Sequence, residues 1–243
     1  MTKPPAPERG SRTRRQLALY RLGLTLLGMT FRVGPLASIL ARTSKVFLRH
    51  ARIRTFLARF AFDGIVDGGA NVGEFAHLVR DTLPDADLVC VEPHPPSASL
   101  LRKKGFRVVE AALWNRAETL RLTQPGDATT SCTVIPGDGK ALGAWEVTAM
   151  RLDELQVAGS NVLVKLDLQG AEPQALCGMD RLWDRCCALL LEVSLGPNGD
   201  YESLRADLTR RGFREYATLN EFEVDGRVVE ADKVWVRSEP GAA

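Results

Sequence analysis

The sequence predicts an α/β fold: a doubly wound, mostly parallel sheet with an antiparallel C-terminal hairpin and a helical N-terminal extension. Three observations lead to this prediction. From residue 64 onward, short apolar runs alternate with helix-like stretches, a pattern typical of parallel sheets covered by helices. The first apolar run leads through a glycine-rich turn into a helix, in IVDGGANVGEF (65–75). The 243 residues, 45% of them hydrophobic and 26% charged, are enough for one sizeable core.

Charge separates the chain into two regions. Residues 1–62 hold 13 Lys and Arg residues against a single acid, whereas residues 63–243 hold 19 against 29. We therefore expect a basic, partly disordered and helical extension over residues 1–61, followed by one domain over residues 62–243. The five cysteines form no C-x-x-C pair, and Cys90 and Cys187 lie in apolar runs, so buried free thiols in a reducing compartment are favoured over a zinc site or disulfides.

The extension has the pattern of a basic amphipathic helix. Its expected apolar face consists of Tyr20, Leu24, Leu27 and Phe31. Pro35 is expected to end this helix. Only ten uncharged residues separate Arg21 from Arg32, against the roughly 20 that a membrane span needs, and no signal peptide is predicted. Peripheral membrane contact through residues 14–60, RNA binding, and a cap on the domain or on a second subunit stay open, with the cap favoured.

The elements of the domain follow from local patterns. The expected strands are GIVD (64–67), LVCVE (88–92), FRVVEAAL (106–113), NVLVKLDL (161–168) and CALLLEVS (187–194). The expected helices span residues 72–82, 95–105, 171–183 and 201–212. The Thr-rich stretch 116–139 is expected to form one or two antiparallel hairpins, after which WEVTAMRLDEL (145–155) returns to the core. Residues 214–219 and 226–237 are expected to pair as the terminal hairpin.

The glycine turn is expected to bind a cofactor, because ligands of such sheets lie beyond the carboxyl ends of the strands. Asp67 ends the first strand, and Gly69 and Gly73 bracket the turn. This D-x-G-x-x-x-G spacing differs from the dinucleotide fingerprint and suits S-adenosylmethionine. Asp67 would bind the ammonium of its methionyl end directly or through water. Asn71 would offer its amide to the same end or cap the next helix. Tight packing of strand on helix would also select glycine here.

A second acid, Glu92, ends the next strand and lies 25 residues after the first. Its two carboxylate oxygens can accept both hydroxyls of a ribose. Glu110, at the end of the third strand, is expected to accept from the adenine amino group. The predicted cofactor-binding residues are Asp67, Gly69, Ala70, Asn71, Gly73, Glu92, Pro93, Glu110, Ala111, Ala112 and Ser131, the last expected to close over the methionyl end.

Six motifs occur in order along the domain. They are D-G-G-A-N-V-G (67–73), V-E-P-H-P (91–95), E-A-A-L (110–113), R-L-D-E-L (151–155), V-K-L-D-L-Q-G-A-E (164–172) and L-L-L-E-V (189–193). Over roughly residues 62–215, this order resembles the FkbM family of S-adenosylmethionine-dependent methyltransferases. The resemblance implies a Rossmann-like class I methyltransferase fold, and O-methylation of a hydroxyl on a sugar, glycolipid or polyketide-like natural product. It departs from the family pattern at Gln169, where relatives usually carry Glu.

Four charged residues at the ends of the later strands are the candidate catalytic group. An alcohol has a pKa on the order of 15, so a base must take its proton as the new bond forms. Asp167 is the expected base or acceptor ligand, with Lys165 on the same strand face to orient it. Glu192 and Glu172 are equally compatible with structural roles. Asp167 and Glu172 could instead hold a divalent metal, but no third ligand is evident, so no metal ligand is assigned.

The sequence thus predicts an S-adenosylmethionine-dependent O-methyltransferase whose partner is a small-molecule, glycan or lipid-linked hydroxyl acceptor. Two alternatives stay open: an RNA methyltransferase that uses the basic extension, and a non-catalytic cofactor-binding protein. Nucleic acid is disfavoured because the sequence lacks a D-P-P-Y signature and the interleaved aromatic side chains of single-strand binders. The expected location is the cytoplasm, either free or peripheral at the membrane, and a homo-oligomer is compatible with the sequence.

Overall fold

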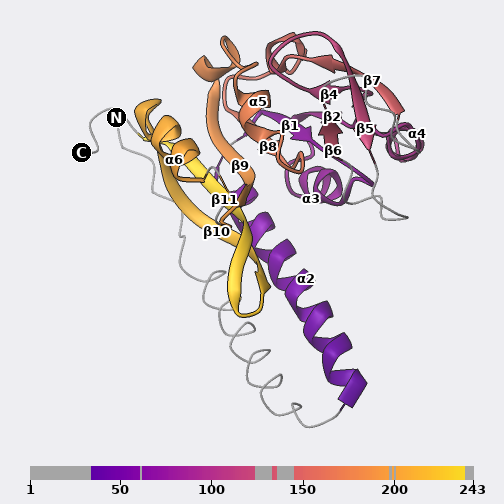
Figure 1. Cartoon of the computed structure of the whole chain (residues 1–243), viewed down its shortest axis with the longest axis vertical. Helices are drawn as coiled ribbons and strands as arrows, with labels where there is room; N and C mark the ends of the chain where they lie inside the picture. Colours follow the sequence, from indigo (N-terminus) through magenta and orange to yellow (C-terminus); the bar gives the residue numbers. More distant parts are fainter. Residues whose placement is uncertain are drawn as a thin grey trace, which may run out of the picture. The chain divides into compact units, whose positions relative to one another are not determined.

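A seven-stranded sheet forms the centre of the domain (Figure 1). The computed structural model describes residues 34–60, 62–123, 133–135, 145–196, 199 and 201–238. In spatial order the strands are β10 (Phe213–Val224), β11 (Arg227–Arg237), β9 (Cys186–Ser194), β8 (Val162–Leu166), β1 (Gly64–Gly68), β2 (Asp87–Val91) and β3 (Val108–Val109). The strands from β9 to β3 are parallel, and β11 pairs antiparallel with both β9 and β10. The predicted mostly parallel sheet with an antiparallel terminal hairpin is confirmed.

Helices cover both faces of this sheet. They are α2 (Gly34–Arg59), α3 (Glu74–Thr82), α4 (Pro95–Lys103), α5 (Glu172–Leu176) and α6 (Tyr201–Arg210). On one face, Leu57 of α2 and Val79 of α3 belong to one buried cluster with Ile65 of β1. On the other face, Leu208 of α6 is buried in a cluster with Trp235 of β11. Full burial of side chains of this size contributes roughly 1.5–3 kcal/mol each, so both helical layers stabilise the sheet.

A second, four-stranded sheet follows the third strand. Its spatial order is β4 (Ala112–Leu113), β7 (Trp145–Met150), β5 (Thr119–Thr123) and β6 (Thr133–Ile135). The antiparallel pairing of β5 with β6 agrees with the hairpin expected in the Thr-rich stretch. The single strand predicted over residues 106–113 is wrong, because the chain leaves the large sheet after β3 and its continuation, β4, pairs with β7 instead.

The helix predicted over residues 171–183 is shorter in the structure. It consists of the five-residue α5, a turn, and a short 3-10 helix, Leu182–Asp184. The carboxylate of Asp153 accepts the backbone N–H groups of Asp180, Arg181 and Leu182 at 2.9, 3.0 and 2.9 Å. These bonds replace the helical hydrogen bonds that the same N–H groups would otherwise make, so the α-helix cannot continue through them.

The described N-terminal part of the chain is helical. Helix α2 runs over 26 residues and has Pro35 in its first turn, where proline is well tolerated. The helix predicted before Pro35 lies outside the described residues. The chain divides into two compact units, residues 1–48 and residues 49–243, so the last turns of α2 belong to the same unit as the sheet. Across the described ranges, no helix is long and apolar enough to cross a membrane.

Candidate active site

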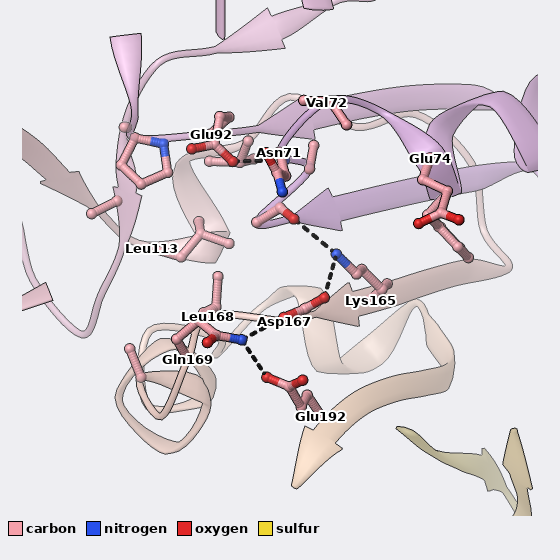
Figure 2. A pocket seen from close by; sticks show the side chains of 18 of the residues that line it. Asn71, Val72, Glu74, Glu92, Leu113, Lys165, Asp167, Leu168, Gln169 and Glu192 are labelled. Carbon is pink, nitrogen blue, oxygen red and sulfur yellow. Dashed lines mark hydrogen bonds and ion pairs between the residues drawn. The ribbon is translucent and has the colours of Figure 1, made fainter. Parts of the chain in front are cut away.

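A cavity of about 290 Å³ lies at the carboxyl ends of β1, β2 and β8 (Figure 2). The turn after β1 and the end of β2 form one part of its lining, and residues at the ends of β8 and β9 form another. The predicted site residues that line it are Gly69, Ala70, Asn71, Glu92, Pro93, Ala111, Ala112, Lys165, Asp167 and Glu192. The structure therefore brings most of the predicted cofactor-binding and catalytic residues to one place.

The turn after β1 depends on glycine for two different reasons. Gly69 has a φ of +70°, and a Cβ atom there would lie 1.9 Å from the carbonyl oxygen of Asp167. The N–H groups of Gly69 and Ala70 donate to the last carbonyl of β2 at 2.9 and 3.2 Å, which fixes the turn beside the cavity. Gly73 has a φ of +87° and does not line the cavity. A Cβ atom at this position would lie 2.7 Å from the Leu101 side chain. Packing, rather than cofactor contact, explains this second glycine.

Alanine at Gly69 is expected to lower the free energy of unfolding by about 2–5 kcal/mol. The left-handed backbone costs a residue with a Cβ roughly 1–2 kcal/mol, and the clash adds roughly 1–3 kcal/mol. Urea unfolding measures the loss. Gly105→Ala is the matched control, because Gly105 has a φ of +79° and no heavy atom lies within 4 Å of its added Cβ. An equal loss in both variants would show that the clash at Gly69 adds nothing.

The carboxylate of Glu92 is held in a fixed orientation at the end of β2. Its Oε2 atom accepts the backbone N–H of Asn71 at 2.7 Å, and its Oε1 atom accepts the backbone N–H of His94 at 2.8 Å. Burial raises the pKa of Glu92, although both of these hydrogen bonds favour the carboxylate. Each oxygen keeps a further lone pair, so a carboxylate on the cavity wall can still accept two hydroxyl groups.

The lining fits an S-adenosyl group. Among the described residues, the buried side-chain oxygen of Asn71 has no hydrogen-bond partner, so it is available to an ammonium donor. Glu92 offers two acceptors for a ribose, and Ala111, Ala112 and Leu122 provide an apolar wall for a flat ring. The individual cofactor contacts stay predictions.

The predicted adenine contact of Glu110 does not fit this placement. The Glu110 carboxylate lies on the surface, paired with Arg102 at 2.6 Å, and does not line the cavity. The break between β3 and β4 falls at this residue, so its side chain is not carried into the site by a continuous strand. Ser131 lies outside the described residues, so its predicted role stays open.

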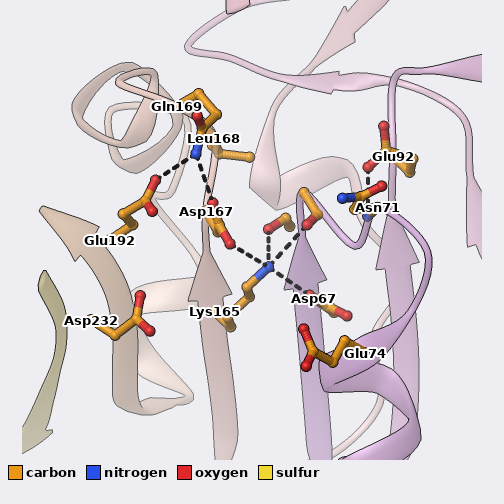
Figure 3. Close-up of polar contacts among 12 residues, drawn as sticks. Asp67, Asn71, Glu74, Glu92, Lys165, Asp167, Leu168, Gln169, Glu192 and Asp232 are labelled. Carbon is orange, nitrogen blue, oxygen red and sulfur yellow. Dashed lines mark hydrogen bonds and ion pairs between the residues drawn. The ribbon is translucent and has the colours of Figure 1, made fainter. Parts of the chain in front are cut away.

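Lys165 is the central cation of the site (Figure 3). Its ammonium group lies 3.0 Å from Asp67 Oδ1 and 3.7 Å from Asp167 Oδ2, and it donates to the carbonyls of Gly68 and Gly69 at 3.1 and 3.0 Å. Burial disfavours its charge, but Asp67 and then Asp167 outweigh burial and raise the pKa of Lys165. These contacts join β8 to the glycine turn, so the geometry supports an orienting role for Lys165.

Asp67 differs from its prediction. Its carboxylate is completely buried, burial raises its pKa against the opposing effect of Lys165, and it does not line the cavity. A direct contact with a cofactor ammonium therefore has no support in this geometry. The physical reason is its partner: the side chain turns toward the buried Lys165 ammonium and neutralises it.

Two acids face each other across the ends of β8 and β9. The side-chain amide of Gln169 donates to Asp167 Oδ1 at 3.2 Å and to Glu192 Oε2 at 2.7 Å (Figures 2 and 3). Burial opposes ionisation of Asp167, but Lys165 and the Gln169 amide lower its pKa. Burial, followed by the nearby carboxylates of Asp167 and Glu172, raises the pKa of Glu192 to about 9. The surroundings of the two acids thus shift their pKa values in opposite directions, which favours the ionised form of Asp167 and the protonated form of Glu192.

Glu172 does not line the cavity. Its buried carboxylate accepts the N–H groups of Leu168 and Gly170 at 2.5 and 3.0 Å, and burial raises its pKa to about 7. This arrangement braces the loop after β8 and supports the structural role, one of the alternatives that the sequence left open for Glu172. In the part of the chain that the structure describes, no group of three or more His, Cys, Asp or Glu side chains is arranged to hold a metal ion.

Four charged residues near the cavity were missed by the sequence predictions. Arg49 Nε lies 3.2 Å from Asp232 Oδ2, and Arg49 Nη1 lies 3.5 Å from Glu74 Oε2. His50 Nε2 lies 2.6 Å from Glu74 Oε1. Asp232 is paired with Glu192 in the register of β11 and β9. The sequence gives these residues only weak signals: Asp232 lies in VVEADKVWV (228–236), which also holds a second acid and a lysine, and Arg49 and His50 lie in the basic extension.

Comparison with known proteins identifies the domain. A sequence model described as the methyltransferase FkbM domain matches residues 67–215, which is more than half of the chain. No curated protein sequence matches the chain.

The chain is similar to solved structures at low sequence identity. Magnesium protoporphyrin IX methyltransferase from Synechocystis PCC 6803, with bound S-adenosylmethionine, is 11% identical, with a TM-score of 0.48 over 85% of this chain and 86% of that chain. An FkbM methyltransferase from Methylobacillus flagellatus KT is 14% identical, with a TM-score of 0.49 over 72% of this chain and 43% of that chain. With the family match and the observed topology together, the chain belongs to the FkbM family of S-adenosylmethionine-dependent methyltransferases.

Proposed function

We propose that the protein is an O-methyltransferase that methylates a hydroxyl group on a sugar, glycolipid or polyketide-like natural product. The observation that carries the proposal is the Asp167 carboxylate, which Lys165 and the Gln169 amide orient on the wall of the cavity that also contains Glu92 and the glycine turn. Transfer to an alcohol needs such a base, because a hydroxyl proton must leave as the new bond forms. The buried Lys165 ammonium lowers the pKa of Asp167 and so favours the ionised form, which is the form that can accept that proton.

S-adenosylmethionine supplies a methyl group bound to a positively charged sulfur. After transfer of the methyl group, the sulfur remains as the neutral thioether of S-adenosylhomocysteine. Glu92 would accept the ribose hydroxyls, and the side-chain oxygen of Asn71 would accept from the ammonium of the methionyl end. Asp167 would take the proton of the acceptor hydroxyl and hold the oxygen in line with the methyl group. The proton then returns to water after the product leaves.

Incubation of the full chain with S-adenosylmethionine carrying a tritiated methyl group tests this proposal. The acceptors offered are methyl glycosides, glycolipids, hydroxylated macrolides and total RNA. Tritium transfer to a hydroxyl compound, lost in Asp167→Asn while S-adenosylhomocysteine still binds, is the expected result. Transfer to RNA alone would overturn the proposal. Binding of S-adenosylhomocysteine without transfer to any acceptor would favour the non-catalytic alternative.

A lipid-linked acceptor would also give the basic extension a role. Residues 1–33 carry seven of the 13 basic residues of the first 62 and only one acid, which favours an anionic membrane surface electrostatically. Removal of residues 1–33 keeps the whole of α2 in the chain, including the residues that pack on the sheet, so it is a cleaner test than removal of the whole extension. Pelleting with anionic but not neutral vesicles, lost on this truncation, is expected for peripheral contact. Pelleting that is unchanged would contradict it.

A further inference from the structure

Gln169 has an unusual backbone conformation at the wall of the cavity. Its φ of +56° lies in the left-handed region, which residues with a Cβ rarely adopt. Such a conformation persists only where the surrounding structure holds it, and residues of this kind cluster at functional sites. The conformation therefore indicates that the Gln169 side chain has a role in the site.

The Glu172 carboxylate holds the backbone around Gln169 in this conformation. The Glu172 carboxylate accepts the backbone N–H groups of the residues on both sides of Gln169, Leu168 and Gly170. Gly170 also has a positive φ, of +97°, so two consecutive residues of the loop are left-handed. A buried carboxylate with two backbone donors is a rigid anchor, and the direction of the Gln169 side chain is fixed with it.

The Gln169 amide uses its two N–H groups on two different acids. It donates to Asp167 at 3.2 Å and to Glu192 at 2.7 Å, and both acids line the cavity (Figure 3). Because Asp167 follows β8 and Glu192 lies in β9, the amide fixes the spacing of two side chains from neighbouring strands. An amide has no charge, so it joins the two acids without neutralising either.

The charges around the two acids are unequal. Lys165 of β8 lies 3.7 Å from Asp167, and the buried Asp67 of β1 shares that cation. On the side of β11, Asp232 faces Glu192 in the strand register, and Arg49 of α2 pairs with Asp232. Glu172 of α5 adds a further carboxylate near Glu192. A cation thus lies beside Asp167, whereas Glu192 is surrounded by acids, so a proton shared by the two belongs on Glu192.

We propose that Gln169 is a positioning residue that holds Asp167 and Glu192 as a carboxylate and carboxylic acid pair with a single proton. In this pair Asp167 is the base, and Glu192 carries the proton. The role of Asp167 as a base rests on the proposed O-methyl transfer. The shared proton and the positioning by Gln169 rest on the geometry of Gln169, and they can be tested without knowledge of the acceptor.

The test is a pH titration of the two carboxyl groups in the full chain, saturated with S-adenosylhomocysteine. Carboxyl carbons labelled with carbon-13 in Asp and Glu are followed by NMR, and the two signals are assigned by their loss in Asp167→Asn and Glu192→Gln. In the wild type, Asp167 is expected to stay ionised down to acidic pH, while Glu192 titrates above neutral pH. Gln169→Gly removes the amide but accepts the left-handed backbone, and it is expected to raise the midpoint of Asp167 by about one pH unit.

Gln169→Glu adds a third carboxyl group, which is expected to raise the midpoints of both acids. Gln156→Glu is the matched control, because Gln156 is exposed and does not line the cavity, and its added charge is expected to leave both midpoints unchanged. Midpoints that are unchanged in both Gln169 variants, or a Glu192 that titrates in the ordinary acidic range in the wild type, would overturn the inference. Failure of the wild type to bind S-adenosylhomocysteine would instead remove the proposed function.

Discussion

Glu92→Ala is expected to weaken binding of S-adenosylhomocysteine at least ~100-fold. Each hydrogen bond from a hydroxyl to a buried carboxylate contributes roughly 1.5–3 kcal/mol, so loss of two costs about 3–6 kcal/mol. The substitution also leaves the N–H groups of Asn71 and His94 without the acceptors that they have in the wild type, at 2.7 and 2.8 Å. The turn that they belong to would then be less well ordered for the ligand. Calorimetric titration of both proteins measures the change.

Glu110→Ala is the control for this measurement. The sequence predicted an adenine contact for Glu110, whereas the structure places its carboxylate on the surface beside Arg102. Its removal is therefore expected to change the affinity by less than about threefold, because surface ion pairs contribute little. Equal loss in the two variants would contradict the described placement of Glu110. Unchanged affinity in Glu92→Ala would exclude Glu92 from the cofactor site.

Most of the fold was predictable because strand and helix periods are local properties of the sequence. The runs around Ile65, Val89 and Leu163 are buried on both faces of the parallel sheet, and such strands are continuously apolar. The errors occurred where a distant residue decides the structure. Asp153 takes the N–H groups that would have continued the helix after Leu176, and the pairing of β4 with β7 ends the strand that began at Val108.

The candidate site was predictable to the extent that it consists of strand ends. Asp167 and Glu92 lie where the carboxyl-end rule for parallel sheets places them. The roles of the other acids depend on how deeply each side chain is buried and on which groups it contacts. Residues far apart in the chain decide both, so no local sequence pattern reveals them. Asp67 and Glu172 are buried and bonded to the protein itself, whereas Glu192 reaches the cavity. Arg49 and Asp232 meet across 183 positions of the chain, so no local pattern could have paired them.

Lys165→Met is expected to lower the free energy of unfolding by about 3–5 kcal/mol at neutral pH, the usual cost of removing one partner from a buried ion pair. Methionine fills a similar volume, but it leaves the completely buried carboxylate of Asp67 without its cation. It also leaves the carbonyls of Gly68 and Gly69 without the donor that they share. Urea unfolding at pH 5 and pH 8 measures the loss.

The pH dependence and a second substitution separate charge from packing in this variant. Burial raises the folded-state pKa of Asp67, so ionisation of this group disfavours the folded state increasingly as the pH rises above its ordinary value. Without Lys165 the effect is larger, and the loss in Lys165→Met is therefore expected to be smaller at pH 5 than at pH 8. Asp67→Asn in the same protein removes the uncompensated charge and is expected to recover much of the stability. A loss that is the same at both pH values and persists in the double variant would contradict this account. Lys165 would then stabilise the fold through its hydrogen bonds to the glycine turn, and not by balancing the charge of Asp67.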